Sequence, residues 1–257
     1  MPIEPPSTVE ESPAIEIVHL VKQFRILHTG SIKGLLSRIW KRPEIVQFTA
    51  LKDISFTVPH GQTLAIIGRN GSGKSTMLGI LARIYRPTSG TVKLNALGGR
   101  TARIAPLLEL GAGFQNDLTG FQNVEFYGAV LGMNARQIKD RMSDIVEFAE
   151  LGEKMDTPLH GWNDGAKLRL GFSIAVHIDP DILLVDEVLA VGDESFQNKC
   201  YRMIADLQAR GKTIVFVSHD LPVVERVANR VLWLNDGVIR QDGDPATVLA
   251  AYRAFAE

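Results

Sequence analysis

Residues 64–76 read LAIIGRNGSGKST, an apolar run followed by a glycine-rich turn, a lysine and two hydroxyl side chains. The turn fits the pattern G-x-x-x-x-G-K-[ST] and stands between a predicted strand over 64–67 and a predicted helix over 75–85. Its glycines let backbone N–H groups point at phosphate oxygens, and the start of the helix adds a positive dipole. The sequence therefore predicts a phosphate-binding loop, formed by Gly68, Asn70, Gly71, Ser72, Gly73, Lys74, Ser75 and Thr76.

Two acidic residues end a second apolar segment, because residues 182–187 read ILLVDE. Side chains at the carboxyl end of a parallel strand face the crevice where open α/β sheets bind ligands. We expect Ser75 and Asp186 to hold Mg²⁺ beside the phosphates, and Glu187 to orient and polarise an attacking water. In isolation, two acids after a strand would equally cap the next helix. The phosphate loop upstream favours the catalytic interpretation.

Two further polar residues are candidates for the same site. His219 follows the apolar segment 213–217 and is placed to contact a γ-phosphate and the attacking water, although a lone histidine is more often structural. Gln115, within GFQN at 113–116, is a candidate to reach the metal and the water. Lys74 would supply a point charge for the β- and γ-phosphates. Together these residues predict hydrolysis of a nucleoside triphosphate.

Composition narrows the class of protein. The chain has 257 residues, is 45% hydrophobic and carries a formal charge of −1, so it lacks the basic field typical of nucleic-acid binding. The single cysteine, Cys200, is expected to be a buried helix residue. The chain contains no apolar run of the roughly 20 residues that span a bilayer. Residues 1–13 are acidic and proline-rich, which predicts a disordered tail rather than a signal peptide.

The order of these motifs resembles the ABC ATPase cassette over nearly all of the chain, from Ala14 to about residue 240. The resemblance implies an α/β P-loop NTPase fold over 14–257, with a parallel-sheet core, an antiparallel β portion and a helical subdomain over about 116–172. It also implies ATP and Mg²⁺ as ligands, a second cassette as partner, and a separate membrane subunit that makes the pore. A homodimer is favoured over a heterodimer. Asp193 falls in the family's D-loop and is expected to lie near the nucleotide.

The signature segment of the family departs from its usual Leu-Ser-Gly-Gly-Gln, because residues 162–166 read WNDGA. In the family this segment of one cassette closes over the ATP of the other, so Asn163 and Gly165 are expected to contact nucleotide. Asp164 opposes this, since two unit charges about 4 Å apart repel by about 4 kcal/mol at an effective dielectric constant of about 20. Asp164 is also a good N-cap for a helix over 167–175, and we favour that interpretation. The departure leaves weak turnover, a heterodimer and an outward-turned side chain as open alternatives.

An aromatic side chain is expected to stack on adenine. Phe24, after the predicted strand 14–21, takes the place of the family's aromatic A-loop residue, and we favour it over Phe48.

An insertion over about 25–48 resembles the cassettes of exporters of lipid-linked O-antigen and teichoic acid. Within it, the apolar positions from Ile32 to Trp40 fall on one helical face with basic residues at its flanks, which fits a helix at the lipid headgroups or against the membrane subunit. An ordinary amphipathic helix packed on its own domain fits the same pattern. We expect a peripheral protein at the cytoplasmic face of the inner membrane, without the carbohydrate-binding domain of some members. The alternatives are another transported cargo, a weakly hydrolysing regulatory cassette, or an ABC ATPase that acts on DNA or ribosomes.

Overall fold

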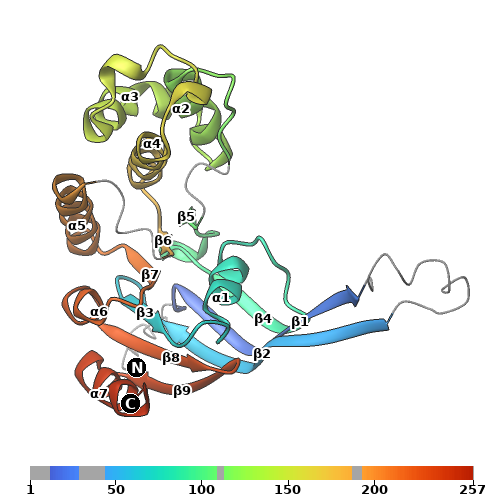
Figure 1. Cartoon of the computed structure of the whole chain (residues 1–257). Coiled ribbons are helices and arrows are strands. Elements are labelled where there is room, and N and C mark those ends of the chain that lie inside the picture. Colours follow the sequence, from blue (N-terminus) through green and yellow to red (C-terminus); the bar gives the residue numbers. More distant parts are fainter. Residues whose placement is uncertain (1–11, 29–43, 109–112, 187–192, 257) are drawn as a thin grey trace, which may run out of the picture.

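The computed structural model describes residues 12–28, 44–108, 113–186 and 193–256. Three parts of the sequence interpretation lie outside these ranges: most of the N-terminal tail, the expected helix from Ile32 to Trp40, and the catalytic candidate Glu187. Figure 1 shows two β-sheets side by side, with a group of helices at one end of the molecule and the C-terminal helix at the other.

A six-stranded sheet forms the centre of the molecule, in the order β5-β6-β7-β3-β8-β9. Its strands are β3 (Thr63–Ile67), β5 (Ile104–Leu107), β6 (Ile182–Val185), β7 (Thr213–Val217), β8 (Arg230–Asn235) and β9 (Val238–Gly243). All neighbours pair in parallel except β8 and β9, which form an antiparallel hairpin. The strands β3, β6 and β7 are buried along their whole length, as expected for parallel strands covered on both faces.

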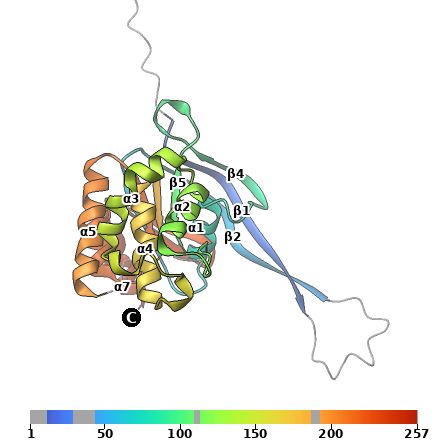
Figure 2. The same ribbon diagram turned by 90° about the horizontal axis from the view of Figure 1, so that it is seen from above.

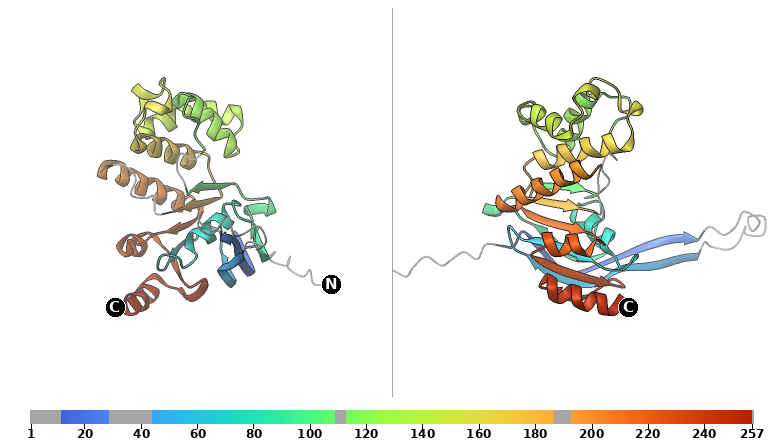
Figure 3. Two further views of the ribbon diagram at one scale, coloured as in Figure 1. Left: turned by 45° about the vertical axis from the view of Figure 1, so that its right-hand side comes forward. Right: turned by 60° about the vertical axis from the view of Figure 1, so that its left-hand side comes forward.

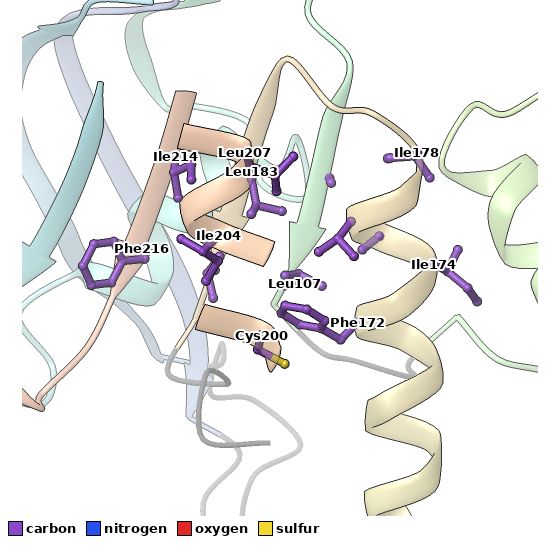
Figure 4. Packing of buried hydrophobic residues seen from close by; sticks show 14 of the residues in the cluster. Leu107, Phe172, Ile174, Ile178, Leu183, Cys200, Ile204, Leu207, Ile214 and Phe216 are labelled. Carbon is purple, nitrogen blue, oxygen red and sulfur yellow. The ribbon is translucent and has the colours of Figure 1, made fainter. Parts of the chain in front are cut away.

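Each face of this sheet packs into its own hydrophobic cluster. Because side chains alternate along a strand, Ala65 and Ile67 of β3 join one cluster while Leu64 and Ile66 join the other. The first cluster continues into the helices drawn in Figure 4, where Phe172 and Cys200 lie close to the strand β5. The second cluster is filled by α1 and by the antiparallel sheet.

The antiparallel sheet has the order β2-β1-β4. Its strands are β1 (Ile15–His28), β2 (Glu44–Val58) and β4 (Ser89–Leu94). Pairing with β4 ends at Val21, so beyond it β1 and β2 continue as a two-stranded ribbon that projects from the body (Figures 2 and 3). These strands are longer than the predicted 14–21 and 51–58. Register shifts between Ile17 and Gln23 break the period of two that the sequence prediction relied on.

A helical lobe stands over one end of the sheet, above α5 in the views of Figure 3. It contains α2 (Gly120–Val130), α3 (Ala135–Ala149) and α4 (Asp164–His177). The helices α2 and α3 each begin with a complete capping box, on Thr119 with Gln122 and on Asn134 with Gln137.

The other helices cover the sheet. They are α1 (Lys74–Leu81), α5 (Glu194–Ala209), α6 (Leu221–Val227) and α7 (Pro245–Ala256). Cys200 on α5 is buried, as predicted, and burial raises the pKa of its thiol to about 12. Among the helices of the described ranges, none is both long and apolar enough to cross a bilayer.

The fold therefore confirms the predicted α/β class with its parallel core and antiparallel β portion. The sequence interpretation missed β4, β5 and α7. The strand β4 is mostly exposed and polar, and β5 has only four residues, one of them a proline, so neither carries a clear apolar alternation.

Candidate phosphate-binding site

The phosphate loop lies between β3, in the interior of the central sheet, and the start of α1. Three glycines of the loop adopt positive φ angles, 149° at Gly68, 81° at Gly71 and 107° at Gly73. Gly73 is also the N-cap of α1, with no side-chain cap, so the first N–H groups of this helix are left for another acceptor. This is the backbone arrangement that binds phosphate at a helix N-terminus.

Two side chains inside the loop fit a bound phosphate chain. Lys74 is buried, and its ammonium group donates to the carbonyl oxygens of Gly68 at 2.7 Å and Arg69 at 3.1 Å. The hydroxyl of Ser72 is buried without a hydrogen-bond partner in the structure. A buried hydroxyl normally has a partner, so its position in this loop fits a ligand oxygen.

The two metal candidates come together in space. Ser75, at the start of α1, and Asp186, directly after β6, line the same pocket of about 280 Å³. A hydroxyl and a carboxylate oxygen are ligands that Mg²⁺ prefers. Tyr127 of α2 lines this pocket too, and burial raises the pKa of its hydroxyl, which therefore stays protonated near neutral pH.

The carboxyl ends of four parallel strands meet at one edge of the sheet. His219 follows β7, between the loop after β3 and Asp186 after β6, and its side chain is exposed. Gln115 follows the chain from β5 and is exposed as well. From this strand order we predict that the side chains of Gln115, Asp186 and His219 lie at the same edge of the sheet as the phosphate loop.

Asn123 of α2 holds the Gln115 segment, and the sequence interpretation missed it. The Asn123 side chain is fully buried, accepts from the N–H of Gln115 at 2.8 Å and donates to the carbonyl of Gln115 at 3.0 Å. Its amide group also donates to the carbonyls of Leu118 and Thr119. One helix residue thus fixes the path of this loop, a role for which an asparagine within α2 gives no sequence signal.

The two candidate aromatic residues are opposite each other on β1 and β2 but have different surroundings. Phe48 is half exposed and lines a pocket of about 190 Å³ together with Asn70, Gly71 and residues 73–76 of the phosphate loop. Phe24 instead packs edge-on against Tyr85 at 5.5 Å, with the Lys22 ammonium group 4.8 Å from its ring centre. The structure therefore places Phe48, rather than the favoured Phe24, beside the loop.

The signature segment begins α4, and its capping differs from the prediction. Asn163 is the N-cap and accepts from the N–H of Ala166 at 2.9 Å, whereas Asp164 is the first helical residue. The prediction that Asp164 caps this helix is wrong, because the helix begins three residues earlier than the expected Lys167. Asp164 is exposed in the first turn, where a negative charge interacts favourably with the helix dipole.

Asp193 has two structural contacts. One carboxylate oxygen accepts from the N–H of Phe196 and caps α5, and the other accepts from the Arg169 guanidinium at 3.1 Å. Asp193, Arg169, Asn163 and Gly165 line one pocket of about 560 Å³. The structure thus brings the signature segment and Asp193 together.

A strand, a glycine-rich loop and an open helix N-terminus, with a hydroxyl and a carboxylate that line one pocket, define a P-loop nucleotide-binding domain. A family model described as ABC transporter matches residues 51–190, more than half of the chain. The chain belongs to the ABC transporter family.

Curated relatives cover most of the chain. The O-antigen export system ATP-binding protein RfbB of Klebsiella pneumoniae is 41% identical over 94% of this chain and 98% of that protein. The protein of the same name from Myxococcus xanthus is 46% identical over 80% of this chain, which spans 46% of that longer protein. The teichoic acids export ATP-binding protein TagH of Listeria innocua is 39% identical over 95% of this chain and 70% of that protein.

Solved structures show the same fold. An ATP-binding subunit of an ABC transporter has a TM-score of 0.74 at 17% identity and covers 93% of both chains. A dimeric ATP-binding cassette in a post-hydrolysis state, bound to ADP and phosphate, has a TM-score of 0.71 at 22% identity, over 90% of this chain and 98% of that one. The family and its relatives make this chain an ATP-binding subunit, with ATP and Mg²⁺ as its ligands.

The two central glycines of the loop differ in what surrounds them, and this gives a stability test. A Cβ atom on Gly73 would lie 2.7 Å from Leu51 Cδ2 and 2.8 Å from the carbonyl oxygen of Ala50, whereas one on Gly71 would meet nothing within 4 Å. A positive φ alone costs an alanine about 1–2 kcal/mol, and overpacking adds about 1–3 kcal/mol. We expect Gly73→Ala to lower the free energy of unfolding in urea by about 2–5 kcal/mol and Gly71→Ala by about 1–2 kcal/mol. Equal losses would contradict the packing of the loop against β2.

Proposed function

We propose that this chain drives the export of a lipid-linked polysaccharide, hydrolysing ATP at an interface with a second cassette and working with a separate membrane subunit. The observation that carries the catalytic part is the shared pocket of Ser75 and Asp186 beside the phosphate loop. The cargo is supported by the relatives named for O-antigen and teichoic acid export, both of which match this chain over almost its full length. The proposed location is the cytoplasmic face of the inner membrane, as a peripheral subunit.

Each residue of the site has a role in attack of water on the γ-phosphate. The loop amides and Lys74 would hold the phosphate chain, and the Ser75 hydroxyl and the Asp186 carboxylate would hold Mg²⁺. Mg²⁺, when bound, offsets the negative charge that develops on the transferring phosphoryl group. Glu187 orients the water and accepts its proton, and His219 contacts the γ-phosphate. Gln115, held in place by Asn123, completes the metal and water side of the site.

ATP turnover of the purified chain, with and without its membrane subunit, tests this proposal. We expect the wild-type chain to hydrolyse ATP, and Glu187→Gln to lower kcat about 100-fold or more because the general base is lost. Asp164→Gly should leave the unfolding free energy within about 1 kcal/mol, since only a helix-dipole contact is removed while Asn163 still caps α4. A wild-type chain that binds ATP without turnover, and that Asp164→Gly activates, would instead favour a weakly hydrolysing regulatory cassette.

The position of Phe48 gives a second prediction, that its ring stacks on adenine. Stacking of an aromatic ring on a base contributes about 1–3 kcal/mol. Phe48→Ala should therefore weaken ATP binding by roughly fivefold to a hundredfold in equilibrium titration. Phe24→Ala is the matched control, and we expect it to change ATP affinity less than about twofold while it removes the contact with Tyr85. A larger effect of Phe24→Ala than of Phe48→Ala would reverse the assignment.

The membrane subunit is proposed to dock where the Mg²⁺ pocket opens to the surface. Ile84 and Tyr85, after α1, line this pocket along with Ser75 and Asp186, and they are 61% and 40% exposed. Exposed apolar side chains beside a polar site are typical of a protein contact. A segment packed on them would be linked to the metal ligands through one helix, α1.

We expect Ile84→Glu to abolish co-purification with the membrane subunit and the stimulation of ATPase activity by it, because a carboxylate would be desolvated in the contact. The stimulation of each variant is measured relative to its own basal ATPase activity, because Ile84 lines the pocket of Ser75 and Asp186. Leu97→Glu is the matched control, since Leu97 is 58% exposed and lies away from this pocket on the turn after β4. If both variants bind the membrane subunit equally well, the docking surface lies elsewhere.

A further inference from the structure

Glu150, directly after α3, adopts a backbone conformation that is uncommon for residues other than glycine. Its φ is 57°, in the left-handed region, and it is the C-cap of the helix. Helices commonly end on a residue in this conformation, but that residue is usually glycine, because a Cβ atom is disfavoured there. A glutamate at such a position points to a role for its carboxylate.

That carboxylate joins the end of α3 to two other helices. One oxygen accepts from the ammonium group of Lys199 on α5 at 3.0 Å, and the other lies 3.5 Å from the guanidinium group of Arg169 on α4. Lys199 also donates to the carbonyl of Phe148 at 2.9 Å, and so satisfies an acceptor in the last turn of α3. Glu150 therefore joins the C-terminal end of α3 to the N-terminal halves of α4 and α5.

Arg169 extends the contact to the start of α5. Its guanidinium group donates to Asp193 at 3.1 Å and lies 4.6 Å from the centre of the Phe196 ring. Only 18% of the Arg169 side chain is exposed, whereas its partners Glu150 and Asp193 are 48% and 65% exposed, so solvent screens these ion pairs in part. Asp193 follows the catalytic candidate Glu187 closely in the sequence and caps α5. A change in the position of α3 and α4 relative to α5 must alter these contacts.

We propose that Glu150 is a positioning residue for ATP hydrolysis. It fixes the helical lobe to α5 through Lys199 and Arg169, and thereby sets the place of the signature segment relative to the start of α5. This inference rests on the ATPase activity proposed above and names a residue outside the phosphate-binding site. Glu150 lines the same pocket as Asn163, Gly165 and Asp193, and it acts on turnover through the arrangement of the helices.

Asp179 provides a matched control. It follows the C-terminal end of α4, whereas the signature segment lies at the N-terminal end of this helix. It also has a positive φ, 52°, just after a helix end, and its carboxylate also pairs with a lysine and an arginine near the end of α5, Lys212 and Arg210. A glycine at either position relieves the same backbone strain and removes a similar pair of ionic contacts. The two sites differ in that Asp179 is remote from the signature segment and from Asp193.

The test compares Glu150→Gly with Asp179→Gly in the full chain, measuring kcat, the dissociation constant for ATP and the melting temperature. We expect Glu150→Gly to lower kcat about tenfold or more, with ATP affinity within about twofold and the melting temperature nearly unchanged, because glycine suits this backbone. Glu150→Gln keeps the strain but loses the charge, and it should show the same fall in kcat. Asp179→Gly should leave kcat unchanged.

A second measurement does not depend on turnover. Spin labels on Lys139→Cys in α3 and Arg253→Cys in α7 report the distance between the lobe and the core, and the buried thiol of Cys200 does not compete for the label. Glu150→Gly should broaden this distance distribution, and Asp179→Gly should not.

The kinetic measurements would overturn the inference if they showed an unchanged kcat in Glu150→Gly, an equal fall in Asp179→Gly, or a loss of ATP affinity that accounts for the fall. A wild-type chain without turnover would contradict the proposed ATPase activity itself. The distance distribution then decides on Glu150 alone, because broadening supports its positioning role and an unchanged distribution refutes it.

Discussion

Parallel pairing of β3, β6 and β7 places the loops that follow these three strands at the same edge of the central sheet. The rest of the site depends on this pairing. The phosphate loop, Asp186 and His219 each follow one of these strands, so their distance from one another is set by the spacing between strands. The strands are buried on both faces, which makes their register costly to change. The central sheet is therefore a rigid framework against which the surrounding helices pack.

The helical lobe is attached to this frame differently. Its apolar side chains belong to the same cluster as one face of the sheet, so burial holds it in place. Its orientation at the nucleotide side also involves polar contacts, through Asn123 under the Gln115 segment and Glu150 at the end of α3. Hydrophobic contact is not directional, whereas hydrogen bonds and ion pairs are. Burial therefore holds the lobe against the sheet, and the directional polar contacts set its orientation at the nucleotide side.

Much of the fold and the site could be predicted from the sequence, and the failures have identifiable causes. The phosphate loop and the strand ILLV at 182–185 were predictable because each combines a local pattern with a distinctive context. The length of β1 and β2 was not, because bulges interrupt their alternation. The choice between Phe24 and Phe48 depends on which ring faces the loop, and sequence position alone gives no information on that. The cap of α4 was misassigned because asparagine and aspartate are both good caps and stand next to each other. Asn123 and Glu150 act through tertiary contacts, for which a single sequence carries no signal.

The N-termini of α1 and α4 differ in their caps and in the charge of their first turns. At α1 the N-cap is a glycine without a side-chain cap, and the first turn has no acidic residue, so the amides and the dipole are available to an external anion. At α4 the Asn163 side chain takes the N–H of Ala166, and Asp164 places a negative charge on the same end of the dipole. Side chains of this protein therefore already occupy one N–H group and offset part of the positive dipole that would attract an anion at the start of α4. Attraction for an anion is therefore weaker at the start of α4 than at the phosphate loop.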